Sequence, residues 1–162
     1  MPRRTKAILG PSRLSQILLS LNRDPKPVLH GVKALRLTLA ARNDHFGARH
    51  FVKEDLPRIQ YANQGIEVLV NKRPKSPTET WNPELVLEYR NGSAKTFDLS
   101  QKWSTSIFQE VMDAAGGQAW SRWKAKRHAA SLPVLDNMPE SASPLAKHPS
   151  AAEKTGAAAV LP

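Results

Sequence analysis

The positive charge of this chain is concentrated at its two ends, and this distribution limits which part can fold. The chain has 162 residues and a formal net charge of +10. Residues 1–30 carry six Lys or Arg and one acid, and residues 118–162 carry six and three. Residues 31–117 carry twelve bases and ten acids, so this segment is nearly neutral. Blocks of like charge cannot bury a core of their own. We therefore expect a folded domain at 31–117 between a basic N-terminal extension (1–30) and a C-terminal extension (118–162) that is first basic and then rich in Pro and Ala.

Two classes of protein are excluded by composition. The chain has no cysteine, which removes disulfide frameworks, cysteine zinc sites and thiol nucleophiles. A membrane-spanning helix needs about 20 mainly apolar residues, and uncharged stretches such as residues 14–22 are far shorter. The excess of positive charge indicates a polyanionic partner, with nucleic acid ahead of an anionic membrane surface.

Hydrophobic periodicity predicts the regular elements of the middle segment. Leu35, Leu37 and Leu39 alternate with polar residues, as in a half-buried strand. Apolar residues after Phe46 follow the helical period up to about Tyr61. In chain order, the expected elements are a strand at 33–40, a helix at 46–61, strands at 66–70, 84–90 and 94–99, and a helix at 104–115.

Turn and capping residues set the expected boundaries. Pro57 removes a backbone donor, so the first helix should kink or divide there, with Pro57 in the first turn of the second part. Three prolines place a loop at 72–83. Asn91-Gly92 predicts a β-hairpin with a type I′ turn. Gly116-Gly117 ends the last helix, and Ser12 caps a short helix in the N-terminal extension.

The order of elements predicts an α/β fold. Two strands joined through a helix should be parallel with a right-handed crossover, and the two strands of the hairpin are antiparallel. The result is a β-α-β-β-α chain with a mixed four-stranded sheet and flanking helices, which is the thioredoxin-like arrangement, plus extended basic N- and C-terminal extensions.

Residues that could carry catalysis or bind a metal do not form a recognisable set. The five histidines are scattered, and His45 and His50 are five residues apart, which suits neither a shared helix face nor a metal pair. Glu54 and Asp55 point to different faces of a helix and make a poor acid–base pair. No GxSxG nucleophile elbow or phosphate-binding loop occurs. We expect no catalytic residues, no metal site and no cofactor.

The extensions hold the candidate nucleic-acid contacts. In residues 120–127, two tryptophans alternate with four bases, which offers aromatic faces for stacking and cations for phosphates. Alternatively, Trp120 and Trp123 dock a helical extension onto the domain, and both roles can hold together. Basic termini can also be only solvated tails, and the acid-free first 23 residues also fit a mitochondrial presequence. The candidate RNA-binding residues are Arg3, Arg4, Lys6, Arg13, Arg23, Lys26, Trp120, Arg122, Trp123, Lys124, Lys126 and Arg127.

A run ahead of the second strand carries a family resemblance. Leu56, Pro57, Ile59, Tyr61 and Asn63 match a Leu-Pro-x-Ile-x-Tyr-x-Asn-Pro pattern, with Gln64 in place of the last proline. With the strand that follows, this run resembles the thioredoxin-like family shared by several mitochondrial ribosomal proteins and a small accessory subunit of respiratory complex I. The likeness covers about residues 32–117 and not the basic extensions.

The resemblance implies a non-catalytic, matrix-located mitochondrial protein that contacts ribosomal RNA and neighbouring ribosomal proteins. Among relatives, the sequence looks most like a fungal protein of the large subunit, and the small-subunit member is close behind. The resemblance leaves open an accessory subunit of complex I, which would bind protein and not RNA. An enzyme of thioredoxin-like lineage would need a reactive cysteine, which this chain lacks.

Overall fold

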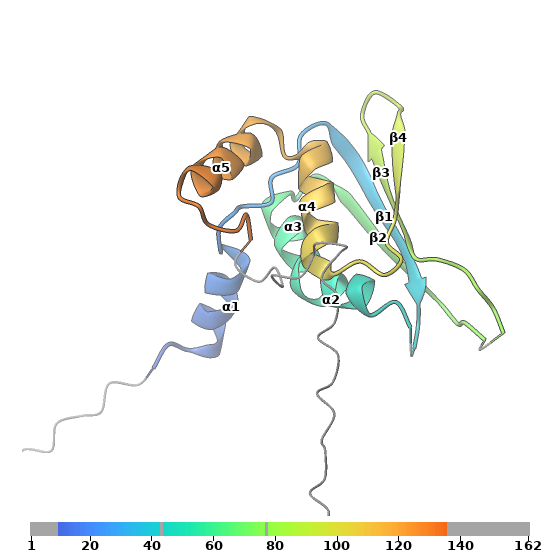
Figure 1. The fold of residues 1–162 in the computed structure, drawn as a ribbon. Helices are drawn as coiled ribbons and strands as arrows, with labels where there is room; N and C mark the ends of the chain where they lie inside the picture. The colour runs from blue at the N-terminus through green and yellow to red at the C-terminus, as the bar shows by residue number, and fades with distance from the viewer. Residues whose placement is uncertain (1–9, 43, 77, 136–162) are drawn as a thin grey trace, which may run out of the picture.

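The computed structural model describes residues 10–42, 44–76 and 78–135 (Figure 1). Arg3, Arg4 and Lys6, and most of the Pro- and Ala-rich C-terminal segment, lie outside the described residues. No helix in the described ranges has the length and apolar content that a membrane crossing requires. The elements are, in order, α1 (Arg13–Leu21), β1 (Val32–Ala40), α2 (Phe46–Glu54), α3 (Leu56–Ala62), β2 (Glu67–Arg73), β3 (Glu84–Tyr89), β4 (Ala94–Asp98), α4 (Ser104–Ala115) and α5 (Gly117–Ala129).

The four strands form one mixed sheet with the order β2-β1-β3-β4. β1 pairs in parallel with β2, with Leu35 opposite Val68, and antiparallel with β3, with Leu35 opposite Leu87. β3 and β4 are antiparallel. The predicted mixed four-stranded sheet with flanking helices is therefore confirmed, whereas the closer likeness to thioredoxin stays a prediction.

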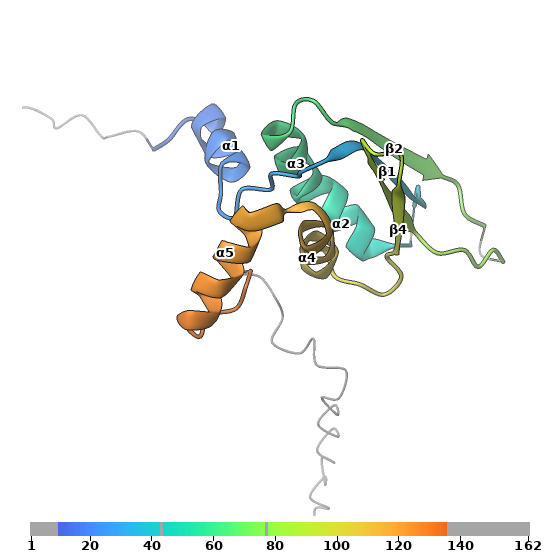
Figure 2. The same ribbon diagram turned by 90° about the horizontal axis from the view of Figure 1, so that it is seen from above.

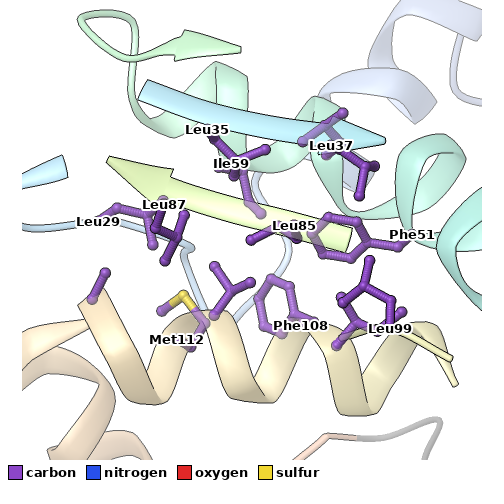
Figure 3. Packing of buried hydrophobic residues seen from close by; sticks show 14 of the residues in the cluster. Leu29, Leu35, Leu37, Phe51, Ile59, Leu85, Leu87, Leu99, Phe108 and Met112 are labelled. Carbon is purple, nitrogen blue, oxygen red and sulfur yellow. The ribbon is translucent and has the colours of Figure 1, made fainter. Parts of the chain in front are cut away.

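The core lies between one face of the sheet and the helices. Leu35, Leu37, Leu85 and Leu87 have no exposed surface, and Figure 3 shows their side chains directed towards Phe108 and the rest of the inner face of α4. Figure 2 shows α2, α3 and α4 on the same side of the sheet. This arrangement explains the alternating sequence of β1, because every second residue must fill this layer.

The helix predicted at 46–61 is divided, as expected from Pro57. α2 ends at Glu54 and α3 begins at Leu56, with Pro57 in its first turn. A proline is tolerated there because the first amides of a helix have no intrahelical acceptor. β2 continues to Arg73, so the irregular connection to β3 begins two residues later than the predicted loop.

The hairpin between β3 and β4 is at the predicted place, but its predicted turn type is wrong. The carbonyl of Tyr89 accepts from the amide of Gly92 at 3.1 Å, and the amide of Tyr89 donates to Ser93 at 2.8 Å. Gly92 has a φ of 84°, whereas Asn91 is not among the described residues with positive φ. A type I′ turn needs positive φ at both central residues. The geometry is instead a three-residue loop that ends on a left-handed glycine, and Asn91 uses its side chain to accept from the amide of Ser93 at 3.0 Å.

The core also includes residues beyond position 117. Trp120, Val134 and Leu135 belong to the same buried cluster as the sheet leucines. Leu29 joins this cluster from the N-terminal side. The division into three segments at residues 30 and 117 stays a prediction, because charge and not packing defined it.

Candidate nucleic-acid interface

Helix α1 carries the first described base of the N-terminal extension, Arg13. The Ser12 side chain accepts from the amide of Ser15 at 3.2 Å, which is the predicted N-cap. Arg13 follows at the first helical position and is exposed. No residue of α1 is buried, and Leu14 is 66% exposed. The helix packs only lightly, against α3, and the segment that follows it connects it to the domain.

That segment, residues 23–29, is held by two side chains of the α3 region. Arg58 is 8% exposed, and its Nη2 donates to the carbonyls of Arg23 at 2.8 Å and Pro25 at 3.0 Å. Asn63 donates to the carbonyl of Pro27 at 2.6 Å and accepts from the amide of Leu29 at 2.9 Å. A buried backbone needs such partners where no sheet supplies them. Sequence reasoning missed this role of Arg58, because its acceptors lie on a distant segment that no local pattern indicates.

Arg58 is balanced by a carboxylate one turn away. Its Nη1 donates to Asp55 at 3.1 Å, and its guanidinium lies 5.4 Å from the centre of the Phe108 ring. Burial raises the pKa of Asp55 to about 6, against the opposing attraction of Arg58. The guanidinium is thus neutralised inside the protein and acts as a clamp, not as a surface cation.

The aromatic residues of α5 attach this helix to α4. Trp120 is 3% exposed, and its Nε1 donates to Asp113 at 2.6 Å. Lys124 donates to the same Asp113 oxygen at 2.6 Å. The docking interpretation therefore describes Trp120 in this structure, and its ring has no free face for a nucleotide. Nothing in the structure tests RNA contacts by the remaining candidates.

The chain after α5 folds back along that helix. Trp123 donates through Nε1 to the carbonyl of Val134 at 3.0 Å, and Arg127 donates to the carbonyl of Pro133 at 2.7 Å. The Arg127 guanidinium also lies 5.5 Å from the Trp123 ring centre. Two of the four predicted bases of α5, Lys124 and Arg127, thus have structural partners.

The other two bases of α5 face solvent. Arg122 and Lys126 are exposed and four residues apart, so they share a helix face. No acidic residue lies between 114 and 135, and neither base forms an ion pair with any described residue. Among the described bases of α5, these two side chains are therefore the ones that remain candidates for phosphate contacts.

The bases of both extensions lie at one end of the molecule. Figures 1 and 2 both place α1 and α5 on the side opposite the β3–β4 hairpin. Arg13, Lys26, Arg122 and Lys126 are exposed there, and Arg23 is exposed at the junction after α1. The fold thus places on the same side of the molecule two sets of bases that are far apart in sequence.

The histidines do not form a metal site among the described residues. His45 has a largely buried side chain that accepts from the amide of Ala40 at 3.0 Å through Nδ1, so its Nε2 carries the hydrogen directed at the Trp81 carbonyl, 3.1 Å away. Lys75 donates to that carbonyl at 3.1 Å and to Asp44, and the bond from Lys75 holds the pKa of Asp44 below its usual value. This cluster fastens the loop between β2 and β3 to the end of β1, a structural role that the sequence did not indicate.

Comparisons with known proteins agree with this fold. Residues 48–103 match the family described as "Mitochondrial ribosomal protein L51 / S25 / CI-B8 domain". The chain is also 30% identical over 82 residues to the large ribosomal subunit protein mL61 of Schizosaccharomyces pombe. That alignment covers 50% of this chain and 58% of the relative, so it spans little more than half of that protein. The family match includes α3, all of β2, β3 and β4, and the Leu56–Asn63 motif. The resemblance read from the sequence is confirmed, because residues 48–103 match the model of the mitochondrial ribosomal protein L51/S25/CI-B8 domain family.

Proposed function

We propose that this chain is a structural constituent of the large subunit of the mitochondrial ribosome, located in the mitochondrial matrix. The family description and the name of the S. pombe relative support a ribosomal role. The role is non-catalytic and uses no cofactor, metal or small-molecule substrate. The basic extensions bind ribosomal RNA, and the domain contacts neighbouring ribosomal proteins.

The observation that carries this proposal is the position of the bases. α1 and α5 lie at the same end of the molecule (Figures 1 and 2), and the exposed Arg13, Lys26, Arg122 and Lys126 belong to this end. Neutralising phosphates with Lys and Arg releases counterions, which is the main source of sequence-independent affinity for nucleic acid. The interface therefore fits the backbone of a folded RNA.

The test is sedimentation of the full chain, tagged, in a mitochondrial lysate. Removing residues 118–162 would also remove Trp120, Val134 and Leu135 from the core, so charge changes are the better variants. The double variant Arg122→Gln, Lys126→Gln is expected to shift from the large-subunit fraction to the top of the gradient as salt rises. The matched control, Lys33→Gln with Lys95→Gln, removes two exposed bases from the sheet and should sediment as the wild type does.

Three outcomes would overturn parts of this proposal. Equal sedimentation of both double variants at every salt concentration would contradict RNA binding through α5. Association with the small subunit would place the chain in the other half of the ribosome. Co-purification with NADH dehydrogenase activity would instead identify an accessory subunit of complex I.

A further inference from the structure

Two large aromatic side chains are exposed at the start of α2 and just before α4. Phe46 is 65% exposed and Trp103 is 64% exposed. Phe46 is the first residue of α2, and Trp103 immediately precedes α4. Exposed aromatic surface of this size, brought together from distant parts of the chain, marks a binding site more often than a single exposed apolar residue does.

The two residues are fixed relative to each other by a backbone contact. A Cβ atom on Gly47 would lie 1.8 Å from the carbonyl oxygen of Lys102 and 3.6 Å from the Cα of Trp103. Only glycine allows the first turn of α2 to lie directly on the residues before α4. Figure 1 shows that both helices begin at the same end of the helical layer. The backbone segments that carry Phe46 and Trp103 are therefore held close together by the fold.

The pair lies in an open groove of about 1870 Å³ that extends to α1. Arg13 and Ile17 of α1 line it at one end, Phe108 and Leu135 line its apolar wall, and Phe46 and Trp103 lie in its lining as well. The groove is thus continuous with the basic end of the molecule described above. A polyanionic chain that contacts Arg13 of α1 can therefore extend into the groove.

The charges of the groove favour a polyanion. Two of its four carboxylates are paired with a cation, and Asp24 has no ion pair to a described residue. Arg13 and Lys53, by contrast, line the groove without a carboxylate partner in the part of the chain that the structure describes. The first turns of α2 and α4 contain no acid. The paired carboxylates are Asp44 with Lys75 and Asp55 with Arg58, and the Glu54 carboxylate lies 3.6 Å from the His50 ring.

We propose that Phe46 and Trp103 form a stacking platform for unpaired RNA bases in this groove. Bases stack on aromatic side chains whatever their identity, and cations along the groove contact the phosphates. This inference rests on the proposed function and assigns a second RNA contact, separate from the bases of α5. It also replaces Trp120, which is buried, with Trp103 as the tryptophan available for stacking.

The experiment titrates the full chain with single-stranded RNA of about 10 nucleotides and follows both affinity and tryptophan fluorescence. Trp103 is exposed, whereas Trp81 and Trp123 are half-buried and Trp120 is buried. Wild type is expected to show quenching on binding. Trp103→Phe keeps an aromatic ring and should bind with nearly unchanged affinity but lose the quenching. Trp103→Ala should lose the quenching and about tenfold in affinity, and Phe46→Ala should lose affinity to a similar extent.

The controls separate this inference from the proposed function. Leu69→Ala removes an apolar side chain, 44% exposed, from β2 outside the groove and should leave both readouts unchanged. If Arg122→Gln with Lys126→Gln weakens binding while Trp103→Ala does not, the stacking platform is refuted and the proposed function stands. If Trp103 in the assembled particle crosslinks to a protein and not to RNA, the platform is likewise refuted. If the wild-type chain binds no RNA, both the proposed RNA binding and the stacking platform are refuted.

Discussion

The positively charged side chain of Arg58 is buried and holds the backbone of a segment that is distant in sequence. Its guanidinium bonds two carbonyls of residues 23–25 and the carboxylate of Asp55. The side chains of Arg58 and Asp55 are only 10% and 14% exposed. These bonds, all made by Nη1 and Nη2, offset the cost of burying the charge, whereas the buried Nε has no hydrogen-bond partner among the described residues.

Replacing Arg58 with Ala should therefore destabilise the fold strongly. The change leaves the Asp55 carboxylate buried without a cation and two carbonyls without a donor. Loss of one member of a buried ion pair costs about 3 kcal/mol or more, and urea unfolding at neutral pH measures the change in the free energy of unfolding. Arg49→Ala, on the exposed face of α2, is the control and should change it by less than about 0.5 kcal/mol. Equal effects of the two substitutions would show that Arg58 is no clamp.

Asp55 should make stability depend on pH. Its pKa is raised to about 6 in the folded state from an ordinary value of 3.8, chiefly by burial. Between these two values the folded state binds more protons than the unfolded state, so the contribution of Asp55 to stability is full below about 4 and is lost as pH rises through about 6. Urea unfolding of wild type and Asp55→Asn from acid to neutral pH measures it. The variant should lack this decline, and parallel curves for the two proteins would contradict the raised pKa.

At the scale of elements, the hairpin depends on one backbone conformation. Gly92 has a φ of 84°, and a Cβ there would meet no atom within 4 Å. Gly92→Ala should therefore act through backbone strain alone and destabilise the fold by about 1 kcal/mol. Thermal unfolding measures this against Gly65→Ala, whose backbone is outside the left-handed region and whose surroundings are equally open. A hairpin that tolerated both substitutions equally would not need the left-handed glycine.

The regular elements could be predicted from sequence because each has a local cause. Alternating leucines determine β1, and Pro57 separates α2 from α3. The turn type could not be predicted, since an Asn-Gly pair suits both a two-residue loop and a longer loop with the glycine at its end. The cap at Ser12 correctly indicates the helix α1, but a cap does not say whether another part of the protein covers the helix, and here Leu14, Ile17 and Leu18 remain exposed.

The candidate site could be predicted only in part. The sequence composition identifies the basic segments. It does not predict that they lie at one end of the molecule, because their placement depends on how α5 packs against α4. The four bases of α5 looked equivalent in sequence. Asp113 and the returning carbonyl of Pro133 make Lys124 and Arg127 structural, and these contacts join residues six to eleven positions apart across a helix break or a turn.

At the scale of the whole molecule, the exposed bases should set the salt dependence of RNA binding. The logarithm of the association constant falls with the logarithm of salt concentration, with a slope of roughly 0.7 for each phosphate contact to a single strand. Arg122→Gln with Lys126→Gln should make the slope shallower by about 1.4, and Trp103→Ala should leave it unchanged. Fluorescence polarisation of labelled RNA at several salt concentrations measures it. A slope unaffected by removing both bases would mean that neither contacts phosphate.

The contact at Gly47 also limits how this protein can change over evolutionary time. Even one added methyl group would overlap the Lys102 carbonyl, and an overpacked junction can be relieved only by moving one helix away from the other. A substitution at this position therefore cannot be accommodated without moving the backbone of one of the two helices. Glycine here should persist in descendants of this chain for as long as α2 and α4 begin together.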